Sequence, residues 1–285
     1  MWSSVRIGIS TACLYGFPLR YTLRLAAECG FDGVELVMAP EIRLRGATGV
    51  MRLCRAYDMD ILAVHVALLP PGRFKNNAKG LVDATRMGLE LSAPSVVFHG
   101  PFADWPTRRA QRWLDALDRC QRMVKGTATR LALENVGVYE GKESEDVLGA
   151  IPTLCSFARL YDLFLTLDTC HVGNGPLGLM DTYAQMRSRL VNVHLSDYAQ
   201  IPARGAPNNP NHRLPLGRHG LYAEHQLPGE GDLPLAEFLA RLKRDDYDGA
   251  VNLEIGPAAL RIWSSRKTRQ RLSQAREFVA QALAM

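Results

Sequence analysis

The sequence lacks the features that mark membrane proteins and secreted proteins. Its apolar runs stay far short of the ~18 residues that a membrane helix needs. The first ten residues, MWSSVRIGIS, lack the long apolar core of a secretory signal peptide. The six cysteines are scattered and form no C-x-x-C pair, which is typical of reduced thiols and not of a disulfide framework. We therefore expect a cytoplasmic protein with no membrane partner.

The sequence also lacks the glycine-rich motifs of nucleotide-binding proteins. It contains no Walker A motif and no G-x-G-x-x-G fingerprint, and the triplet Gly229-Glu230-Gly231 follows a loop instead of a strand. No nucleotide cofactor is therefore expected. Charge of one sign is scarce too, because 34 basic and 29 acidic residues give a net charge of only +5. This mild excess is compatible with an anionic substrate or with nucleic acid but establishes neither.

What the sequence does contain is a regular alternation of short apolar runs and longer amphipathic stretches. In a chain of 285 residues with 47% hydrophobic and 22% charged residues, this alternation is typical of soluble α/β proteins. The predicted strands are residues 6–11, 33–38, 61–67, 95–100, 130–136, 163–168, 190–197 and 249–255. The predicted helices are residues 19–30 and stretches near 48–57, 78–91, 107–125, 144–160, 179–189, 234–243 and 258–283. Most strand runs are almost continuously apolar, as strands covered on both faces must be.

Eight repeats of strand and helix predict an α/β fold, namely a (β/α)8 TIM barrel, with a doubly wound open sheet as the alternative. We find no boundary that would divide the chain, so residues 1–285 are expected to form a single domain. One long irregular segment, near 198–232, is rich in Pro, Gly, Asn, Arg and His. A loop of this length in a compact domain is usually functional or mobile, and we place it at the mouth of the barrel.

Carboxylate and imidazole side chains close the last four predicted strands. Glu134 ends RLALE, Asp168 ends LFLTLD, His194 is late in LVNVHL, and Glu254 is late in VNLE. In a barrel these positions meet at the carboxyl-terminal mouth, where barrel active sites lie. Uncompensated charges would repel one another there and would be costly to desolvate, and a divalent cation removes that cost. We therefore predict that these four residues bind Mn²⁺, Mg²⁺, Co²⁺, Fe²⁺ or Zn²⁺.

Further histidines are expected near the same mouth. His65 and His99 lie near the ends of the third and fourth predicted strands, and His171 follows Asp168 by three residues. Taken singly, each of them has an ordinary structural explanation, because a lone histidine on a strand is more often a satisfied core or surface residue than a ligand. It is the set as a whole that favours a site.

At these positions the chain resembles the xylose isomerase-like TIM-barrel superfamily, which is also AP endonuclease family 2. The resemblance covers nearly the whole chain and is carried by the segments IGIST, GFDGVEL, LALENV, LDTCHVG, VNVHLSD, LPGEGDLPLAEFL and YDGAVNLEIG. This superfamily includes sugar isomerases and epimerases as well as endonuclease IV-type enzymes that repair abasic DNA. Each segment alone is a weak signal, and together they are a specific one.

The epimerase branch of this superfamily implies one metal held by Glu134, Asp168, His194 and Glu254. The resemblance implies that Glu134 and Glu254 are also catalytic, since they would flank the substrate carbon and exchange a proton through a metal-bound enediolate. The metal would act as a Lewis acid on adjacent carbonyl and hydroxyl oxygens. His171 would contact the substrate.

The endonuclease IV branch implies the same four ligands and additional metals. His65 and His99 match its first additional site, and His171 and His225 match ligands of its third site. An aspartate that this branch has two residues before His225 is replaced by Ala223. The surroundings favour the isomerase branch, because MAPEIRLRGATG does not resemble the DNA-reading loop and the Val-Ala-Leu-Leu after His65 contains no aromatic residue. The four histidines are thus predicted to be additional metal ligands or substrate contacts.

Four more residues are candidates for the site or its surroundings. Arg218, in the 198–232 loop, could bind an anionic group of the substrate or could be a solvated surface residue. Trp105, after HGPFAD, could stack on a sugar face or could pack at the start of a helix. Glu35, within GVELV, could reach the mouth, but we favour a pairing with an arginine. Cys170 is expected to be a packed thiol, since no base is placed to activate it.

The sequence therefore predicts an enzyme, a divalent-metal-dependent isomerase or epimerase of a small sugar, sugar phosphate or sugar acid. The alternatives are a phosphodiesterase acting on abasic DNA, a lyase or dehydratase on the same scaffold, and a binding barrel that has lost its chemistry. The expected partner is a small carbohydrate, nucleic acid is disfavoured, and a homo-oligomer is compatible with the sequence. The identity of the substrate does not follow from the fold.

Overall fold

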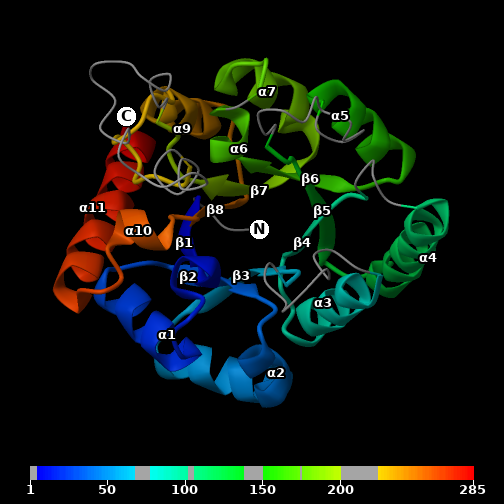
Figure 1. Ribbon diagram of the computed structural model, residues 1–285, viewed down its shortest axis with the longest axis horizontal. Helices are drawn as coiled ribbons and strands as arrows, with labels where there is room; N and C mark the ends of the chain where they lie inside the picture. The colour runs from blue at the N-terminus through cyan, green and yellow to red at the C-terminus, as the bar shows by residue number, and fades with distance from the viewer. Residues whose placement is uncertain (1–4, 68–77, 102–105, 138–149, 174, 200–223) are drawn as a thin grey trace.

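The apolar runs form the strands of a closed parallel barrel in the computed structural model, which describes residues 5–67, 78–101, 106–137, 150–173, 175–199 and 224–285 (Figure 1). The strands are β1 (Arg6–Ser10), β2 (Gly33–Val37), β3 (Asp60–His65), β4 (Ser95–His99), β5 (Arg130–Glu134), β6 (Phe164–Asp168), β7 (Leu190–Leu195) and β8 (Ala250–Leu253). They pair in chain order, and β1 also pairs with β8. The predicted TIM barrel is confirmed, and the open doubly wound sheet is wrong.

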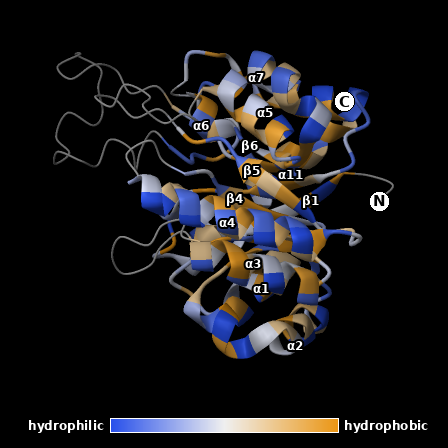
Figure 2. Ribbon diagram, turned by 90° about the vertical axis from the view of Figure 1, so that its right-hand side faces the viewer, coloured by the Kyte–Doolittle hydropathy of each residue, from blue (hydrophilic) through white to orange (hydrophobic). Residues whose placement is uncertain are grey.

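Helices surround the barrel as an outer ring (Figure 1). The longer ones are α1 (Leu19–Glu28), α2 (Pro40–Ala56), α3 (Ala78–Glu90), α4 (Thr107–Val124), α5 (Ile151–Leu160), α7 (Leu179–Met186), α9 (Leu235–Arg244) and α11 (Ser265–Ala284). The short ones are η1 (Thr11–Leu14), α6 (Thr169–Gly173), η2 (Arg187–Arg189) and α10 (Pro257–Leu260). Figure 2 shows hydrophilic and hydrophobic residues interspersed along α4, the pattern of a helix with one face on the core. Among the described helices, none combines the length and the apolar character that a membrane span requires.

Two helices differ from their predicted bounds. The helix predicted near 48–57 begins already at Pro40, and Gly46 interrupts it with φ 63° and ψ 173°. Glycine adopts this conformation freely and other residues avoid it, so α2 is kinked there. The helix predicted over 258–283 is two helices, because Arg261 takes a left-handed conformation (φ 56°) at the end of α10. Of the helix predicted near 144–160, the part before Ala150 lies outside the described residues.

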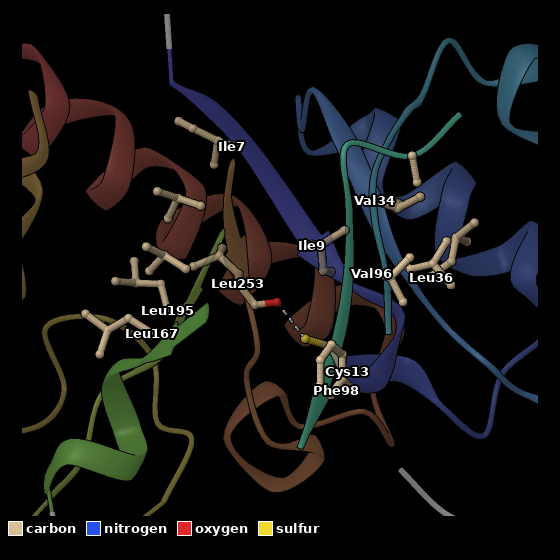
Figure 3. Packing of buried hydrophobic residues seen from close by; sticks show 14 of the residues in the cluster. Ile7, Ile9, Cys13, Val34, Leu36, Val96, Phe98, Leu167, Leu195 and Leu253 are labelled. Atoms are coloured by element: carbon tan, nitrogen blue, oxygen red, sulfur yellow. Dashed lines mark hydrogen bonds between the residues drawn. The ribbon is translucent and has the colours of Figure 1, made fainter. Parts of the chain in front are cut away.

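Side chains along each strand alternate between two environments. Residues such as Ile9, Phe98 and Leu253 pack between the strands and the helices, in the large core that Figure 3 shows in part. A small second cluster on the inner side of the strands comprises Ala63, Val97, Ala132 and Val191. Successive side chains of a strand point to opposite faces. The residues two positions after Ala63, Val97 and Ala132, which are His65, His99 and Glu134, therefore also face the barrel interior, at its carboxyl end.

Gly33 begins β2 where this strand passes close to β3. A Cβ atom added to Gly33 would lie 2.9 Å from the carbonyl carbon of Asp60 and closer still to its oxygen. Because that obstacle is backbone, β3 itself must shift. We expect Gly33→Ala to lower the free energy of unfolding by about 1–3 kcal/mol, the usual cost of overpacking. Urea denaturation measures this loss.

Gly16→Ala is the matched control for Gly33→Ala. A Cβ atom added to Gly16 meets no atom within 4 Å, so we expect a change in stability of less than about 0.5 kcal/mol. Equal stability of the two variants would contradict the close approach of β3 to Gly33.

Candidate metal centre

The carboxyl ends of the last four strands bring the predicted quartet together. Glu134 and Asp168 are the last residues of β5 and β6, His194 is near the end of β7, and Glu254 directly follows β8. One ligand atom of each lies within 4.8 Å of the others. Glu134, Asp168 and His194 are buried, and the Glu254 side chain is only 14% exposed. The four side chains thus share one site at the barrel mouth with little access to water.

His194 contacts three carboxylates from different strands. Its Nδ1 is 3.1 Å from Glu134 Oε1 and 2.9 Å from Glu254 Oε2. Its other ring nitrogen, Nε2, is 2.8 Å from Glu35 Oε2. The prediction that Glu35 pairs with an arginine is therefore wrong, because the Glu35 carboxylate contacts His194 and Asn192 instead. The Glu35 side chain faces the barrel interior, where these two side chains lie.

Asp168 is held by the backbone of α6, the short helix that follows it. Its Oδ1 accepts hydrogen bonds from the backbone N–H groups of Cys170 (2.8 Å) and His171 (3.2 Å). Its Oδ2 is buried and has no hydrogen-bond partner among the described residues. The His171 ring lies beside this atom, with its Nδ1 3.3 Å away. One oxygen of Asp168 is thus fixed by hydrogen bonds, and the other faces the site.

Asn135 is a site residue that the sequence pattern does not single out. Its side-chain amide donates to the carbonyl of Asp168 at 3.0 Å, and its Oδ1 accepts from the Asp168 N–H at 2.7 Å. Its backbone carbonyl accepts from His171 Nδ1 at 3.0 Å. Asn135 therefore ties β5 to β6 at the level of the site. Its one sequence signal is its position in LALEN, directly after the strand-end glutamate.

Backbone carbonyls orient three other histidines at the mouth, namely His65, His171 and His225. Nδ1 of His65 lies 2.6 Å from the carbonyl oxygen of Val66, and Nδ1 of His225 lies 3.0 Å from that of Glu254. A carbonyl oxygen only accepts, so we assign the Nδ1 proton to these two residues and to His171. The second ring nitrogen of His65 faces the Glu134 carboxylate, which also only accepts, so without a metal this ring donates from Nε2 as well. Metal-binding histidines are oriented in this way.

Two further groups of residues adjoin the quartet. His65 Nε2 is 3.0 Å and His99 Nε2 is 3.5 Å from Glu134 Oε2. Burial lowers the pKa of His99 to about 4, so this ring is neutral at pH 7 and offers a lone pair. Two groups have ligand atoms close enough together to hold a metal. One comprises His65, His99 and Glu134, and the other comprises Asp168, His171 and His225. Each of them shares a carboxylate with the quartet.

The buried charges of the site shift one another's pKa values. Burial acts to lower the pKa of His194, but Glu35, Glu134 and Glu254 together raise it well above its ordinary value. Burial acts to raise the pKa of Glu254, but His194 opposes this and the pKa falls to about 2. In the absence of a metal, the imidazole and the carboxylates thus stabilise one another's charged forms.

The quartet fits a divalent metal ion. Three carboxylates and one imidazole are donors that Mn²⁺, Mg²⁺, Co²⁺, Fe²⁺ and Zn²⁺ accept. A cation would bind the Asp168 Oδ2 atom, which makes no hydrogen bond among the described residues, and it would compensate the carboxylates that surround His194 Nδ1. Glu134, Asp168, His194 and Glu254 are the residues able to hold it.

Two buried cysteines hold the backbone around the site. Cys13 Sγ donates to the carbonyl of Leu253 at 3.3 Å and accepts from the N–H of Ile255 at 3.1 Å, on either side of Glu254 (Figure 3 shows the first contact). Cys170 Sγ accepts from the N–H of His225 at 3.1 Å. Burial raises the pKa of the Cys170 thiol, so it is a neutral, packed group, as the sequence suggests.

Two predicted substrate contacts, Trp105 and Arg218, lie outside the described residues. The same holds for most of the predicted mouth loop near 198–232, of which residues 200–223 are not described. The described end of that segment contributes His225, whose backbone has a positive φ of 50°.

Comparisons with known proteins give the same fold. A family model described as xylose isomerase-like TIM barrel matches residues 23–280. An uncharacterized protein of Mycobacterium leprae is 27% identical over 284 residues, which is 93% of each chain. Fructoselysine 3-epimerase of Escherichia coli is 21% identical over 272 residues, or 88% of this chain and 90% of the enzyme.

Solved structures of sugar epimerases share the architecture. The crystal structure of D-psicose 3-epimerase with D-tagatose from Clostridium cellulolyticum matches with a TM-score of 0.71 and 13% identity over 98% of this chain and 99% of that one. A D-tagatose 3-epimerase-like protein matches with a TM-score of 0.69 and 18% identity over 98% and 97%. At such identities these likenesses establish the fold.

Proposed function

The chain belongs to the xylose isomerase-like TIM-barrel family, and from this premise we propose that it is a divalent-metal-dependent isomerase or epimerase of a small sugar, sugar phosphate or sugar acid. The observation that carries the proposal is the placement of Glu134 and Glu254. Both carboxylates lie within 3.1 Å of His194 Nδ1, yet they come from β5 and from the end of β8, with β6 and β7 between them in the barrel. Two carboxylates from separate strands can thus approach one substrate carbon from different directions.

Glu134, Asp168, His194 and Glu254 would hold the metal, which when bound supplies Lewis-acid polarisation of adjacent carbonyl and hydroxyl oxygens. One glutamate accepts the proton from the carbon next to the carbonyl, and the electrons of that C–H bond form the double bond of an enediolate. The other glutamate returns a proton. Return to the same carbon from the opposite face gives the epimer. Return to the former carbonyl carbon gives the isomer, provided that the hydroxyl proton also moves from its oxygen to the former carbonyl oxygen. The configuration of the substrate decides which glutamate acts first.

Incubation of the purified protein and Mn²⁺ with a panel of ketoses, their phosphates and keto sugar acids tests this function. We expect a new epimer or isomer of the same mass from at least one compound, detected by NMR and chromatography. A product lighter by one water would instead indicate a dehydratase. Failure of every sugar compound, together with Mn²⁺-dependent nicking of a duplex with an abasic site, would contradict the proposal.

A phosphodiesterase acting on abasic DNA is a second candidate function, and one observation favours it. Two further groups of possible metal ligands each share a carboxylate with the quartet, so the site has donors for more than one metal. One group contains His65 and His99, and the other contains His171 and His225. Elemental analysis of protein purified without added metal or chelator separates the two candidates. One metal per chain favours the sugar enzyme, and two or three favour the phosphodiesterase.

A further inference from the structure

A chain of polar side chains crosses the barrel interior beside the quartet. Glu35 Oε2 accepts hydrogen bonds from Asn192 Nδ2 at 3.2 Å and from His194 Nε2 at 2.8 Å. Asn252 Nδ2 donates to Asn192 Oδ1 at 2.8 Å. All four side chains are fully buried. Because β1 and β8 separate β2 from β7 in the barrel, the contact between Glu35 and His194 reaches across the interior (Figure 1).

The composition of this interior layer is costly for the fold. TIM-barrel interiors are normally filled by bulky branched apolar residues, and a buried carboxylate is unfavourable unless it is fully compensated. Glu35 Oε1 has no hydrogen-bond partner among the described residues. The row of polar side chains also needs the space that Gly8 leaves open. A Cβ atom at this position would lie 2.5 Å from Leu62 Cδ1 and closer still to Asn252 Oδ1. Stability alone therefore gives no reason for a glutamate at position 35.

We propose that Glu35 is a positioning residue for the metal site, an inference that rests on the proposed function. Its carboxylate accepts the Nε2–H of His194 and so holds the ring with Nδ1 facing the space between Glu134 and Glu254, where a bound metal would take the place of the Nδ1 proton. The hydrogen bond from Asn192 fixes the carboxylate in turn. A carboxylate behind a ligating histidine sets the ring orientation and makes the opposite nitrogen a stronger donor to a metal.

Two substitutions separate the charge of Glu35 from its hydrogen bond. Glu35→Gln keeps the size and an acceptor oxygen but removes the charge, whereas Glu35→Leu removes both. Thr166→Val is the matched control. Thr166 is buried on β6, is in register with Asn192, and its Oγ1 has no hydrogen-bond partner among the described residues.

The measurement is the dissociation constant for Mn²⁺, obtained on metal-free protein by competition with a chromophoric chelator. We expect Glu35→Leu to weaken Mn²⁺ binding by about 10–100-fold, the usual effect of losing such a partner, and Glu35→Gln to weaken it less. The absorption spectrum of bound Co²⁺ should change in both variants, because the donor strength of His194 changes. Thr166→Val should keep the wild-type affinity and spectrum.

Wild-type Mn²⁺ affinity and an unchanged Co²⁺ spectrum in both Glu35 variants would overturn this inference and leave the proposed function intact. Circular dichroism of the metal-free proteins verifies the fold. If Glu35→Leu does not fold, Glu35→Gln, which has nearly the same shape, decides the question. Absence of any Mn²⁺ binding by the wild-type protein would overturn the proposed function and this inference with it.

Discussion

Replacing Glu134 by glutamine is expected to lower kcat/KM for the sugar substrate by at least about 10²–10⁴-fold, the usual contribution of a general acid or base. Glu134 Oε1 is 3.1 Å from His194 Nδ1 and Oε2 is 3.0 Å from His65 Nε2, so this carboxylate lies among the groups that would surround substrate and metal. Glutamine keeps the size and much of the hydrogen bonding. It can neither accept a proton from carbon nor compensate a cation. The measurement is kcat/KM at saturating Mn²⁺.

Glu277→Gln is the matched control for this substitution. Glu277 is exposed on α11, where its carboxylate accepts a hydrogen bond from Gln281 at 3.0 Å. The same chemical change at this surface position should leave kcat/KM unaltered. Turnover by Glu134→Gln at the level of Glu277→Gln would show that Glu134 takes no part in proton transfer.

Removal of divalent metal is expected to abolish turnover and to lower the thermal stability of the protein. The quartet gathers Glu134, Asp168 and Glu254 around one imidazole in a buried site, and without a cation the carboxylates repel one another. A metal that binds only the folded chain adds about 2.7 kcal/mol at a free concentration 100-fold above its Kd, which corresponds to a rise of several degrees in Tm. Dialysis against a chelator, followed by stepwise return of Mn²⁺, measures both effects.

Asp168→Asn tests whether the stabilisation arises at the quartet. Asparagine can still accept the N–H groups of Cys170 and His171 through one oxygen, but it lacks the anionic second oxygen. We expect Mn²⁺ to raise the Tm of this variant much less than that of the wild-type protein. Equal shifts in the two proteins would place the bound metal elsewhere, and full activity in the presence of chelator would refute metal dependence.

The strands and the quartet are predictable from sequence for a simple physical reason. Strands covered on both faces read as continuous apolar runs, and a carboxylate at the end of such a run, as at Glu134 or Asp168, breaks the pattern visibly. Parallel strands then bring their ends to one mouth without further information.

The residues that contact the quartet are harder to predict from sequence, because their contacts depend on how the strands are aligned in the barrel. Glu35 lies inside strand β2, and its contact with His194 crosses the barrel interior. The separation of these two residues along the chain does not indicate this contact. Asn135 acts through the backbone of the neighbouring strand. The break between α10 and α11 arises from the left-handed backbone of Arg261, a conformation that arginine adopts without a sequence signal.

Exchange of substrate hydrogen with solvent tests the central claim most directly. The active sugar is incubated in D₂O with the Mn²⁺-loaded protein, and deuterium at the carbon next to the carbonyl is followed by NMR and mass spectrometry. Proton transfer through Glu134 and Glu254 predicts deuterium at that carbon, dependent on Mn²⁺ and lost in Glu134→Gln and Glu254→Gln. Conversion of the sugar with no deuterium from solvent, or exchange that persists in both variants, would contradict the proposed proton transfer by these two glutamates.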